Sequence, residues 1–440
     1  MKLLPCGVLK SVMFWCGTLL LSGCAALLNS DRPKYSGPTI KPVWHNADVR
    51  VVDTPIVSGG VVYAVAKLWD SQRGRVSAFD ARNGKKLWMA QSPAAHIIVV
   101  AGGTIFADDG SGRVSALDAA SGSPAKCIVP RTLGPTTYAD GVLYIAGKDG
   151  TLHAVDVCRR ERWASRVPVS LTTAPVVGGQ TVYVFGTLQV DELTPAFFGL
   201  YAFDRTTGAL RWKRESRERF GKKRYDPKTS AMVWVEKPEE HLVSDVVADA
   251  RTVYVWQENK GTEGYYTSET LSVLDAASGM VHWQHQHSGS CPIGPVLLDS
   301  HDVLVCDGPH GNSSENGWID RTLLRSNGAK QWEAATSWEY EHFIPHDRFL
   351  IVSDHSVHEL LNENGQTSPD SWLTLVDRRN GNEVWRTEIA QLAVFTLPAY
   401  GAGLFVVGSE PFKWGDPPVQ GSRDVAGLWA WRSGIIAQKK

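Results

Sequence analysis

The sequence predicts an all-β fold, an eight-bladed β-propeller in which each blade has four antiparallel strands. Two observations predict it: a pattern of 13 residues recurs along the 440-residue chain, and a second hairpin pattern precedes most of its copies. Many short strands in a repeated unit indicate a propeller, because one such unit cannot bury its apolar face alone.

The recurring pattern is an alternating apolar strand followed by Asp, three residues, Gly, three residues and Trp. The Asp side chain can accept hydrogen bonds from backbone N–H groups two residues on, and the Gly supplies the positive φ of a short bulged hairpin. The Trp then lies on the returning strand and fills space between neighbouring sheets. The four full copies are anchored by Asp80/Gly84/Trp88, Asp204/Gly208/Trp212, Asp275/Gly279/Trp283 and Asp377/Gly381/Trp385.

Three weaker copies fill the gaps between the full ones. The first keeps Asp118 and Gly122 without a Trp, the second keeps Asp156 and Trp163 without the Gly, and the third has Leu324 in place of the Asp. With their upstream hairpins, the units run about 51–88, 94–127, 133–163, 172–212, 241–283, 293–332, 341–385 and 395–436. This gives eight blades, with seven as the alternative if the degenerate second or sixth unit is not a full blade.

The two ends of the propeller are predicted to complete each other. The last unit has no Asp-Gly-Trp hairpin and therefore lacks its outer strand, whereas Trp44 stands near the start with no hairpin before it. Residues 41–45 can supply the missing strand, and this closure removes exposed sheet edges. The predicted propeller then covers residues 44–436.

The first 23 residues predict a signal peptide, with Lys2 and Lys10 ahead of an apolar run that is too short to span a bilayer. The sequence Leu-Ser-Gly-Cys that ends at Cys24 resembles a bacterial lipobox, so Cys24 becomes the lipidated first residue and 24–43 the anchor and tether. An ordinary secretory signal that contains a cysteine is the alternative. By the sorting rule of bacterial lipoproteins, Ala25 and Ala26 imply that the protein is anchored in the outer membrane and faces the periplasm.

Four cysteines, Cys127, Cys158, Cys291 and Cys306, would remain in an oxidising compartment. Cys291 and Cys306 flank an expected hairpin, and Cys127 and Cys158 end equivalent parts of adjacent units. Two disulfides are therefore possible, but the sequence does not fix their connectivity, and four buried free thiols are the alternative.

Five insertions, at 189–198, 258–269, 309–320, 359–371 and 411–424, lie between the second and third strands of their units and should cluster on one face of the ring. A sixth, 213–240, separates the fourth and fifth units. Its surroundings, 211–228, carry nine Lys or Arg against three acids. Lys222, Lys223, Arg224 and Trp234 are candidates for docking an acidic partner or anionic headgroups. A solvated loop is the alternative.

Composition and motifs exclude several functions. The balance of 45 basic and 46 acidic residues argues against nucleic acid as a partner. We find no nucleophile elbow, P-loop or haem-attachment motif. His285 and His287 could face a metal together, although exposed polar residues are the simpler interpretation. The repeated Asp residues are interpreted as turn caps, so no catalytic, metal or cofactor residue is predicted.

Residues 200–212, LYAFDRTTGALRW, and their sibling segments resemble the repeat of the pyrroloquinoline-quinone (PQQ) type propellers, over nearly all of 44–436. One branch, the quinoprotein dehydrogenases, implies a quinone in the central channel, a bound Ca²⁺ and an adjacent Cys-Cys disulfide, and no Cys-Cys pair occurs here. The other branch, the BamB family of lipoproteins, is similar in lipobox, size and blade count.

The BamB resemblance implies a non-enzymatic scaffold without a cofactor, a monomeric propeller within a complex. It would contact the periplasmic POTRA domains of the barrel-inserting subunit and other assembly lipoproteins, and would help deliver unfolded barrel strands to the outer membrane. The alternatives are a quinoprotein oxidoreductase and a propeller lipoprotein that serves another envelope system.

Overall fold

The computed structural model divides the chain into two units, residues 1–37 and 38–440, and every described residue belongs to the second unit. The structure describes residues 41–71, 73–111, 113–126, 134–158, 160–171, 173–188, 197–217, 222–226, 231–236, 241–260, 266–287, 296–297, 302–306, 319–325, 327–336, 341–346, 348–356, 370–391, 393–396, 398–411 and 426–432. The predicted signal peptide, Cys24, Cys127 and Cys291 lie outside these ranges. All described elements are β-strands, and we find among them no helix with the length and apolar character needed to cross a bilayer.

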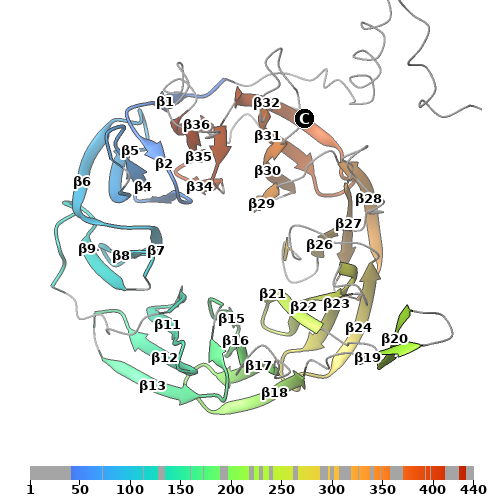
Figure 1. Cartoon of the computed structure of the whole chain (residues 1–440). Coiled ribbons are helices and arrows are strands. Elements are labelled where there is room, and N and C mark those ends of the chain that lie inside the picture. The colour runs from blue at the N-terminus through green and yellow to red at the C-terminus, as the bar shows by residue number, and fades with distance from the viewer. Residues whose placement is uncertain are drawn as a thin grey trace, which may run out of the picture. The chain divides into compact units, whose positions relative to one another are not determined.

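The strands form antiparallel sheets that follow one another in a ring (Figure 1). Blade 1 contains β2 (Arg50–Val51), β3 (Ile56–Ser58), β4 (Val61–Lys67), β5 (Arg75–Asp80) and β6 (Lys86–Pro93). A three-stranded sheet follows, with β7 (His96–Ala101), β8 (Thr104–Asp108) and β9 (Val114–Asp118). Blade 2 contains β10 (Thr136–Ala139), β11 (Val142–Ala146), β12 (Thr151–Asp156) and β13 (Glu161–Arg166). Blade 3 contains β14 (Ser170–Leu171), β15 (Val176–Gly178), β16 (Thr181–Leu188), β17 (Phe197–Asp204) and β18 (Leu210–Arg217).

The second half of the ring continues in the same order. Blade 4 contains β21 (His241–Ala248), β22 (Thr252–Lys260), β23 (Tyr266–Asp275) and β24 (Val281–His287). Blade 5 contains β25 (Val296–Leu297), β26 (Asp302–Cys306), β27 (Ile319–Arg325) and β28 (Lys330–Thr336). Blade 6 contains β29 (Glu341–His346), β30 (Phe349–Ser356), β31 (Asp370–Asp377) and β32 (Glu383–Gln391). Blade 7 contains β33 (Ala393–Phe395), β34 (Ala399–Gly401), β35 (Leu404–Pro411), β36 (Gly427–Arg432) and, as its outer strand, β1 (Trp44–Asn46).

The prediction of eight four-stranded blades is wrong, because the propeller has seven such blades, and the described residues of the unit at 94–127 form a three-stranded sheet. In these residues, which end at Lys126, the outer strand is represented by one isolated bridge, between Leu117 and Pro124, and by a hydrogen bond from the Ala125 N–H to the Ala116 carbonyl at 2.9 Å. In blade 1 the outer strand starts at the equivalent register, where Lys86 pairs with Phe79. Proline has no N–H to donate and is tolerated in a sheet mainly at an edge or a first position. The second unit is therefore incomplete, as the alternative count of seven required.

The predicted closure by an N-terminal strand is confirmed, although the strand is β1 at 44–46 and not 41–45. Trp44 pairs with Ala430, and Asn46 pairs with Leu428. The ring of His45 stacks on that of Trp429, with their centroids 3.5 Å apart. The chain end that lacks an outer strand therefore receives it from the other end.

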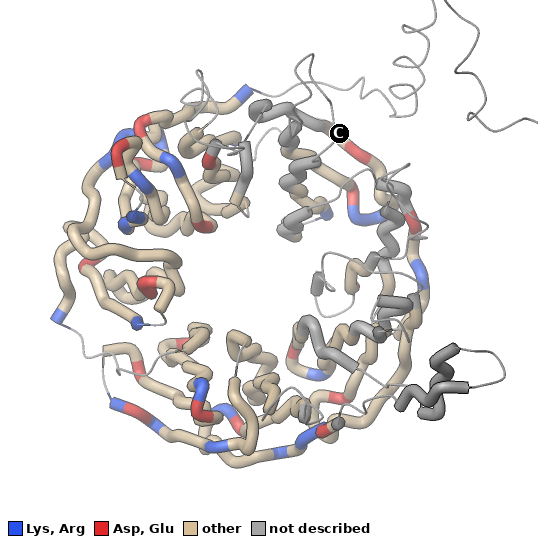
Figure 2. Tube along the Cα trace, in the orientation of Figure 1, with Lys and Arg blue, Asp and Glu red and all other residues tan. Residues whose placement is uncertain are grey.

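The core lies between neighbouring sheets, not within one of them. Tyr144 of blade 2 and Val182 of blade 3 belong to one buried cluster, and Leu304 of blade 5 and Leu350 of blade 6 belong to another. This arrangement follows from the strand sequences, because strands that have sheets on both sides carry apolar residues on both faces. Many charged residues lie along the perimeter, where β13 and β18 each carry both signs and basic residues are in the majority (Figure 2).

The ring has two distinct faces, which we name the turn face and the loop face. The Asp-Gly turns lie on the turn face. In blade 3, Leu188 pairs with Phe197, and Phe197 pairs with Arg217. The end of β16, the start of β17 and the end of β18 therefore lie side by side, on the loop face. The strand ends that flank all five predicted insertions occupy this position in their blades. So does the end of β18, whose last residues, 213–217, are the first of the predicted insertion 213–240.

Candidate functional site

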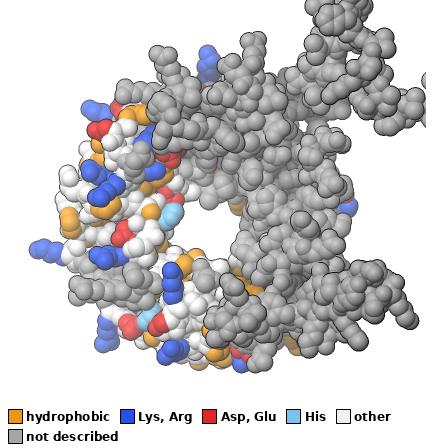
Figure 3. Space-filling view, in the orientation of Figure 1, with side chains coloured by type: hydrophobic (Ala, Val, Ile, Leu, Met, Phe, Trp, Pro, Cys, Tyr) orange, Lys and Arg blue, Asp and Glu red, His pale blue; other side chains and the backbone are white. Residues whose placement is uncertain are grey.

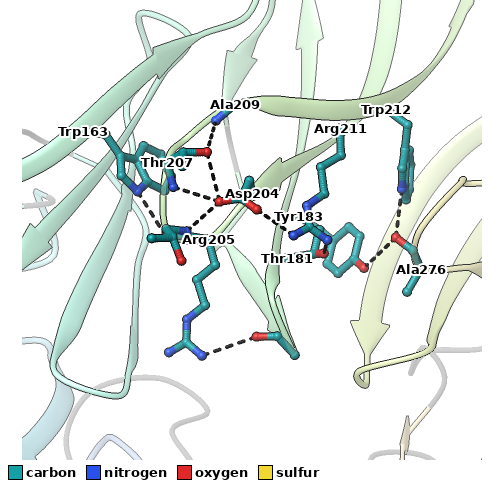
Figure 4. Close-up of polar contacts among 12 residues, drawn as sticks. Trp163, Thr181, Tyr183, Asp204, Arg205, Thr207, Ala209, Arg211, Trp212 and Ala276 are labelled. Atoms are coloured by element: carbon teal, nitrogen blue, oxygen red, sulfur yellow. Dashed lines mark hydrogen bonds and ion pairs between the residues drawn. The ribbon is translucent and has the colours of Figure 1, made fainter.

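The acidic residue of each full repeat holds its own turn, as the sequence predicted. The Oδ1 atom of Asp204 accepts hydrogen bonds from the backbone N–H groups of Thr206 at 3.0 Å and Thr207 at 2.8 Å. Arg211 donates to Oδ2 at 2.6 Å (Figure 4). The bond from Arg211, followed by those from Thr207, holds the pKa of Asp204 well below its ordinary value.

The same arrangement recurs in other turns. A hydrogen bond from the Arg82 side chain lowers the pKa of Asp80 to about 2, and one from Ser278 lowers the pKa of Asp275. These carboxylates sit in separate turns and are each satisfied locally. They therefore act as turn caps, and they do not converge on a common site.

Six tryptophans, five from the repeats and Trp44 from outside them, each pack on the next sheet, in a contact that we name the Trp–Gly clasp. A Cβ atom placed on the turn glycine of one sheet would meet the indole ring of the tryptophan from the preceding sheet, at under 3 Å in five of six cases. The six pairs are Trp44/Gly84, Trp88/Gly122, Trp163/Gly208, Trp212/Gly279, Trp283/Gly328 and Trp332/Gly381. Only glycine allows this approach, and its φ is positive at each of these turns.

The clasp also has a polar component. The indole N–H of Trp212 donates to the carbonyl of Ala276 at 2.9 Å, and that of Trp44 donates to the carbonyl of Ala81 at 2.8 Å. In both cases the acceptor is the residue after the turn aspartate of the next sheet. Figure 4 shows this for Trp163 with Arg205 and for Trp212 with Ala276. The motif residues most visible in the sequence thus join the sheets into one ring.

A charged cluster that the sequence did not reveal joins blade 1 to blade 7 on the loop face. Arg50 is only 4% exposed, and its Nη1 lies 3.2 Å from Oε1 of Glu410. The other amino group donates to the carbonyl oxygens of Leu68 at 3.3 Å and Ser71 at 2.7 Å. Lys67 Nζ lies 3.5 Å from the same Glu410 oxygen. Arg50 and Glu410 are 360 positions apart in the sequence, so no sequence pattern connects them.

The predicted docking residues lie in a hairpin of their own. Lys222, Lys223 and Arg224 begin β19 (Lys222–Asp226), which pairs with β20 (Ala231–Glu236), and Trp234 stands opposite Lys223 in the register. Within the described ranges neither strand joins a blade. Figure 1 draws the two strands at the perimeter of the ring.

The remaining candidates are dispersed. Cys158 is disulfide-bonded and lies in the shortened turn of blade 2, whereas Cys306 ends β26 in blade 5. His282 Nε2 lies 3.7 Å from an oxygen of Asp275, and no three His, Cys, Asp or Glu side chains gather into a metal-binding group in the part of the chain that the structure describes. Figure 3 shows basic and acidic side chains interspersed over the described part of one face, without a patch of one sign.

Comparisons with known proteins give a consistent relationship. The model of the family described as outer membrane protein assembly factor BamB matches residues 34–126 and 125–222. Over 107 residues the chain is 31% identical to BamB of Yersinia pestis. This match covers 23% of this chain and 26% of the relative. It is 30% identical over 107 residues to BamB of Salmonella typhimurium, with 24% and 26% covered. The matched stretch thus spans about a quarter of the length of these curated relatives.

Solved structures show similar folds at low identity. The structure of BamB from Moraxella catarrhalis is 18% identical, with a TM-score of 0.44, and the match covers 71% of this chain and 83% of that chain. The quinohemoprotein alcohol dehydrogenase of Comamonas testosteroni is 12% identical, with a TM-score of 0.48, and the match covers 91% and 78%. The chain is a PQQ-like β-propeller that resembles BamB.

Proposed function

We propose that the protein is a non-enzymatic, BamB-like scaffold that assists the assembly and insertion of β-barrel proteins into the outer membrane through protein–protein contacts. The observation that carries this proposal is the match of residues 34–222 to the BamB family, together with the recurrence of the same repeat to the end of the chain. The partners would be the POTRA-containing barrel-inserting subunit and other assembly lipoproteins. The protein would be held at the periplasmic face of the outer membrane by a lipid on Cys24.

Quinoprotein chemistry is the second function that the repeat suggests, and no observation favours it. The bound Ca²⁺ of such enzymes needs several oxygen ligands at one place. In the described residues the acidic side chains of the repeats are used separately, each in its own turn. The sequence also has no Cys-Cys pair. These residues do not fit the quinone and its metal, and we derive no redox step.

Crosslinking in intact cells tests the proposed function. We expect a short amine-reactive crosslinker, followed by purification and mass spectrometry, to recover the POTRA-containing subunit with the wild-type protein. The Cys24→Ser variant should appear in the soluble periplasm and lose most of that crosslink, since it would have no lipid anchor. Recovery of a different envelope complex would contradict the assembly function, and a Cys24→Ser variant that stays in the outer-membrane fraction would contradict the anchor.

We further propose that the partner docks on the loop face and contacts the β19–β20 hairpin through an acidic protein surface. Charge complementarity supports this occupant, since β19 begins with three consecutive basic residues and nine such residues lie within 211–228. A protein is favoured over a lipid headgroup because, within the described ranges, these two strands pair only with each other, and a strand edge can pair with another polypeptide.

Charge reversal tests this docking surface. The triple variant Lys222→Glu, Lys223→Glu and Arg224→Glu should weaken binding to purified POTRA domains by about tenfold or more at low salt, without lowering thermal stability. The matched control, Lys85→Glu, Lys86→Glu and Arg160→Glu, changes net charge equally at exposed positions of the turn face and should leave affinity nearly unchanged. Equal effects of the two triples would contradict the surface. Loss of binding only to phosphatidylglycerol vesicles would assign the hairpin to lipid.

A further inference from the structure

One junction of the ring lacks both halves of the Trp–Gly clasp. In the three-stranded sheet, Lys126 stands four residues after the turn glycine Gly122, where the full repeats have tryptophan. In the facing turn of blade 2, Asp156 N bonds to the carbonyl of Arg160, whereas the equivalent bond in blade 1 runs one residue further, from Asp80 to Lys85. The positive-φ position of this shorter turn is Cys158, with φ of 58°.

A side chain at this φ is unusual, and it costs about 1–2 kcal/mol relative to glycine. Cys158 is nonetheless found there, it is exposed, and it is disulfide-bonded. The cysteine therefore takes the positive-φ position of this turn, one residue before the position four residues ahead of Trp163, where the full repeats have the clasp glycine, and it extends a covalent bond from there.

The sheet order restricts its partner. Cys306 ends β26 in blade 5, and blades 3 and 4 stand between that blade and blade 2. Cys291 is only five residues before β25 of the same blade. Disulfide-bonded cysteines need Cα atoms within about 7 Å, so blade 5 is too far away. Cys127, by contrast, directly follows Lys126 in the neighbouring sheet.

We infer that Cys158 is bonded to Cys127, and that this disulfide replaces the Trp–Gly clasp between the three-stranded sheet and blade 2. It joins, within one residue, the two positions that touch at six other junctions. Such a bond would add to the apolar contacts of this junction, which has no indole from the adjoining sheet because Lys126 stands where the full repeats have tryptophan.

The bond also ties this junction to the redox compartment. The two thiols give up two protons and two electrons by exchange with a disulfide oxidant, which is itself reduced to a dithiol. Oxidants of that class act on exported proteins, and cytosolic thiols stay reduced. The ring would thus receive its last inter-sheet link only after export.

Peptide mapping of the purified full chain, with free thiols blocked, tests the inference. We expect one linked peptide pair that contains Cys127 and Cys158 and separates on reduction. Cys127→Ser and Cys158→Ser should each lower the unfolding midpoint by roughly 5 °C, and the double variant should lower it no further. A reductant should lower the wild-type midpoint equally and leave the double variant unchanged.

A second variant separates the bond from the backbone conformation. Cys158→Gly relieves the positive φ but removes the sulfur, so it should still lower the midpoint. If it raises the midpoint, the turn needs only a glycine and the inference is wrong. A linked peptide that joins Cys158 to Cys291 or Cys306, or a Cys158 that reacts as a free thiol, would also overturn it.

Discussion

The variant Gly279→Ala is expected to lower the free energy of unfolding by about 2–4 kcal/mol, although it adds one methyl group. Gly279 has φ of 71°, and its added Cβ would lie 2.7 Å from Cδ2 and 2.8 Å from Cε3 of Trp212. The indole cannot move aside easily, because Trp212 is buried and donates to the carbonyl of Ala276. Blades 3 and 4 must therefore separate slightly. Urea denaturation followed by tryptophan fluorescence measures the loss.

The matched control is Gly103→Ala. Gly103 has a similar φ of 76°, but nothing lies within 4 Å of the position that its Cβ would occupy. This variant carries only the backbone strain, about 1 kcal/mol, so the difference between the two alanines isolates the contact with Trp212.

A double-mutant cycle checks the assignment. Trp212→Ala alone should cost about 3–5 kcal/mol, and in that background Gly279→Ala should cost no more than Gly103→Ala. Equal losses from the two alanines in the wild-type background would mean that the clasp carries no packing strain. The positive φ of the turn would then be the whole reason for the glycine.

The spacing of the repeat was sufficient to predict the strands and turns, because both depend on residues close together in the chain. Asp204, for example, bonds to residues two and three positions later. The sequence could not say which glycine meets which tryptophan, since Trp212 and Gly279 lie in the same kind of motif but in different blades. Trp44 is the clearest case, because it completes a clasp with Gly84 from outside any repeat.

The second unit shows where the blade count depended on more than the motif. Val114–Asp118 forms a strand and its turn forms normally, as the retained Asp118 and Gly122 predict. Pro124 then has no N–H to donate at the start of the outer strand, and the described part of that strand, which ends at Lys126, shows a single bridge. The missing tryptophan was visible in the sequence, but a missing tryptophan alone does not show that a unit departs from the four-stranded blade.

The charged residues also fall into those that the sequence reveals and those that it does not. The basic run at 222–224 was visible as composition, and its pairing with β20 adds a local hairpin that this composition did not predict. Arg50 and Glu410 gave no signal, because each is an ordinary charged residue within its own segment. They come together only when the ring closes and brings blade 7 beside blade 1.

That pair provides the second large expected effect. Glu410→Gln should lower the free energy of unfolding by about 2 kcal/mol, since it leaves the buried Arg50 charge with two carbonyl oxygens and no acid. We expect less than the full cost of breaking a buried pair, because the Glu410 side chain is 26% exposed and solvent screens part of the interaction. Glu333→Gln, which breaks an ion pair to Lys330 with both side chains at least 40% exposed, should cost about 0.5 kcal/mol or less.

Hydrogen exchange would show which strands are destabilised in the Glu410→Gln variant. If the pair fastens the seam, protection should fall in β1, β2 and β36 before it falls elsewhere, because those strands meet where the two chain ends join. Arg50→Met with Glu410→Gln should recover part of the lost stability, since it removes the unpaired charge. If Glu410→Gln instead behaves like Glu333→Gln, the seam depends on the β1–β36 hydrogen bonds and the Trp44 clasp alone, and Trp44→Ala should then open the ring at that place.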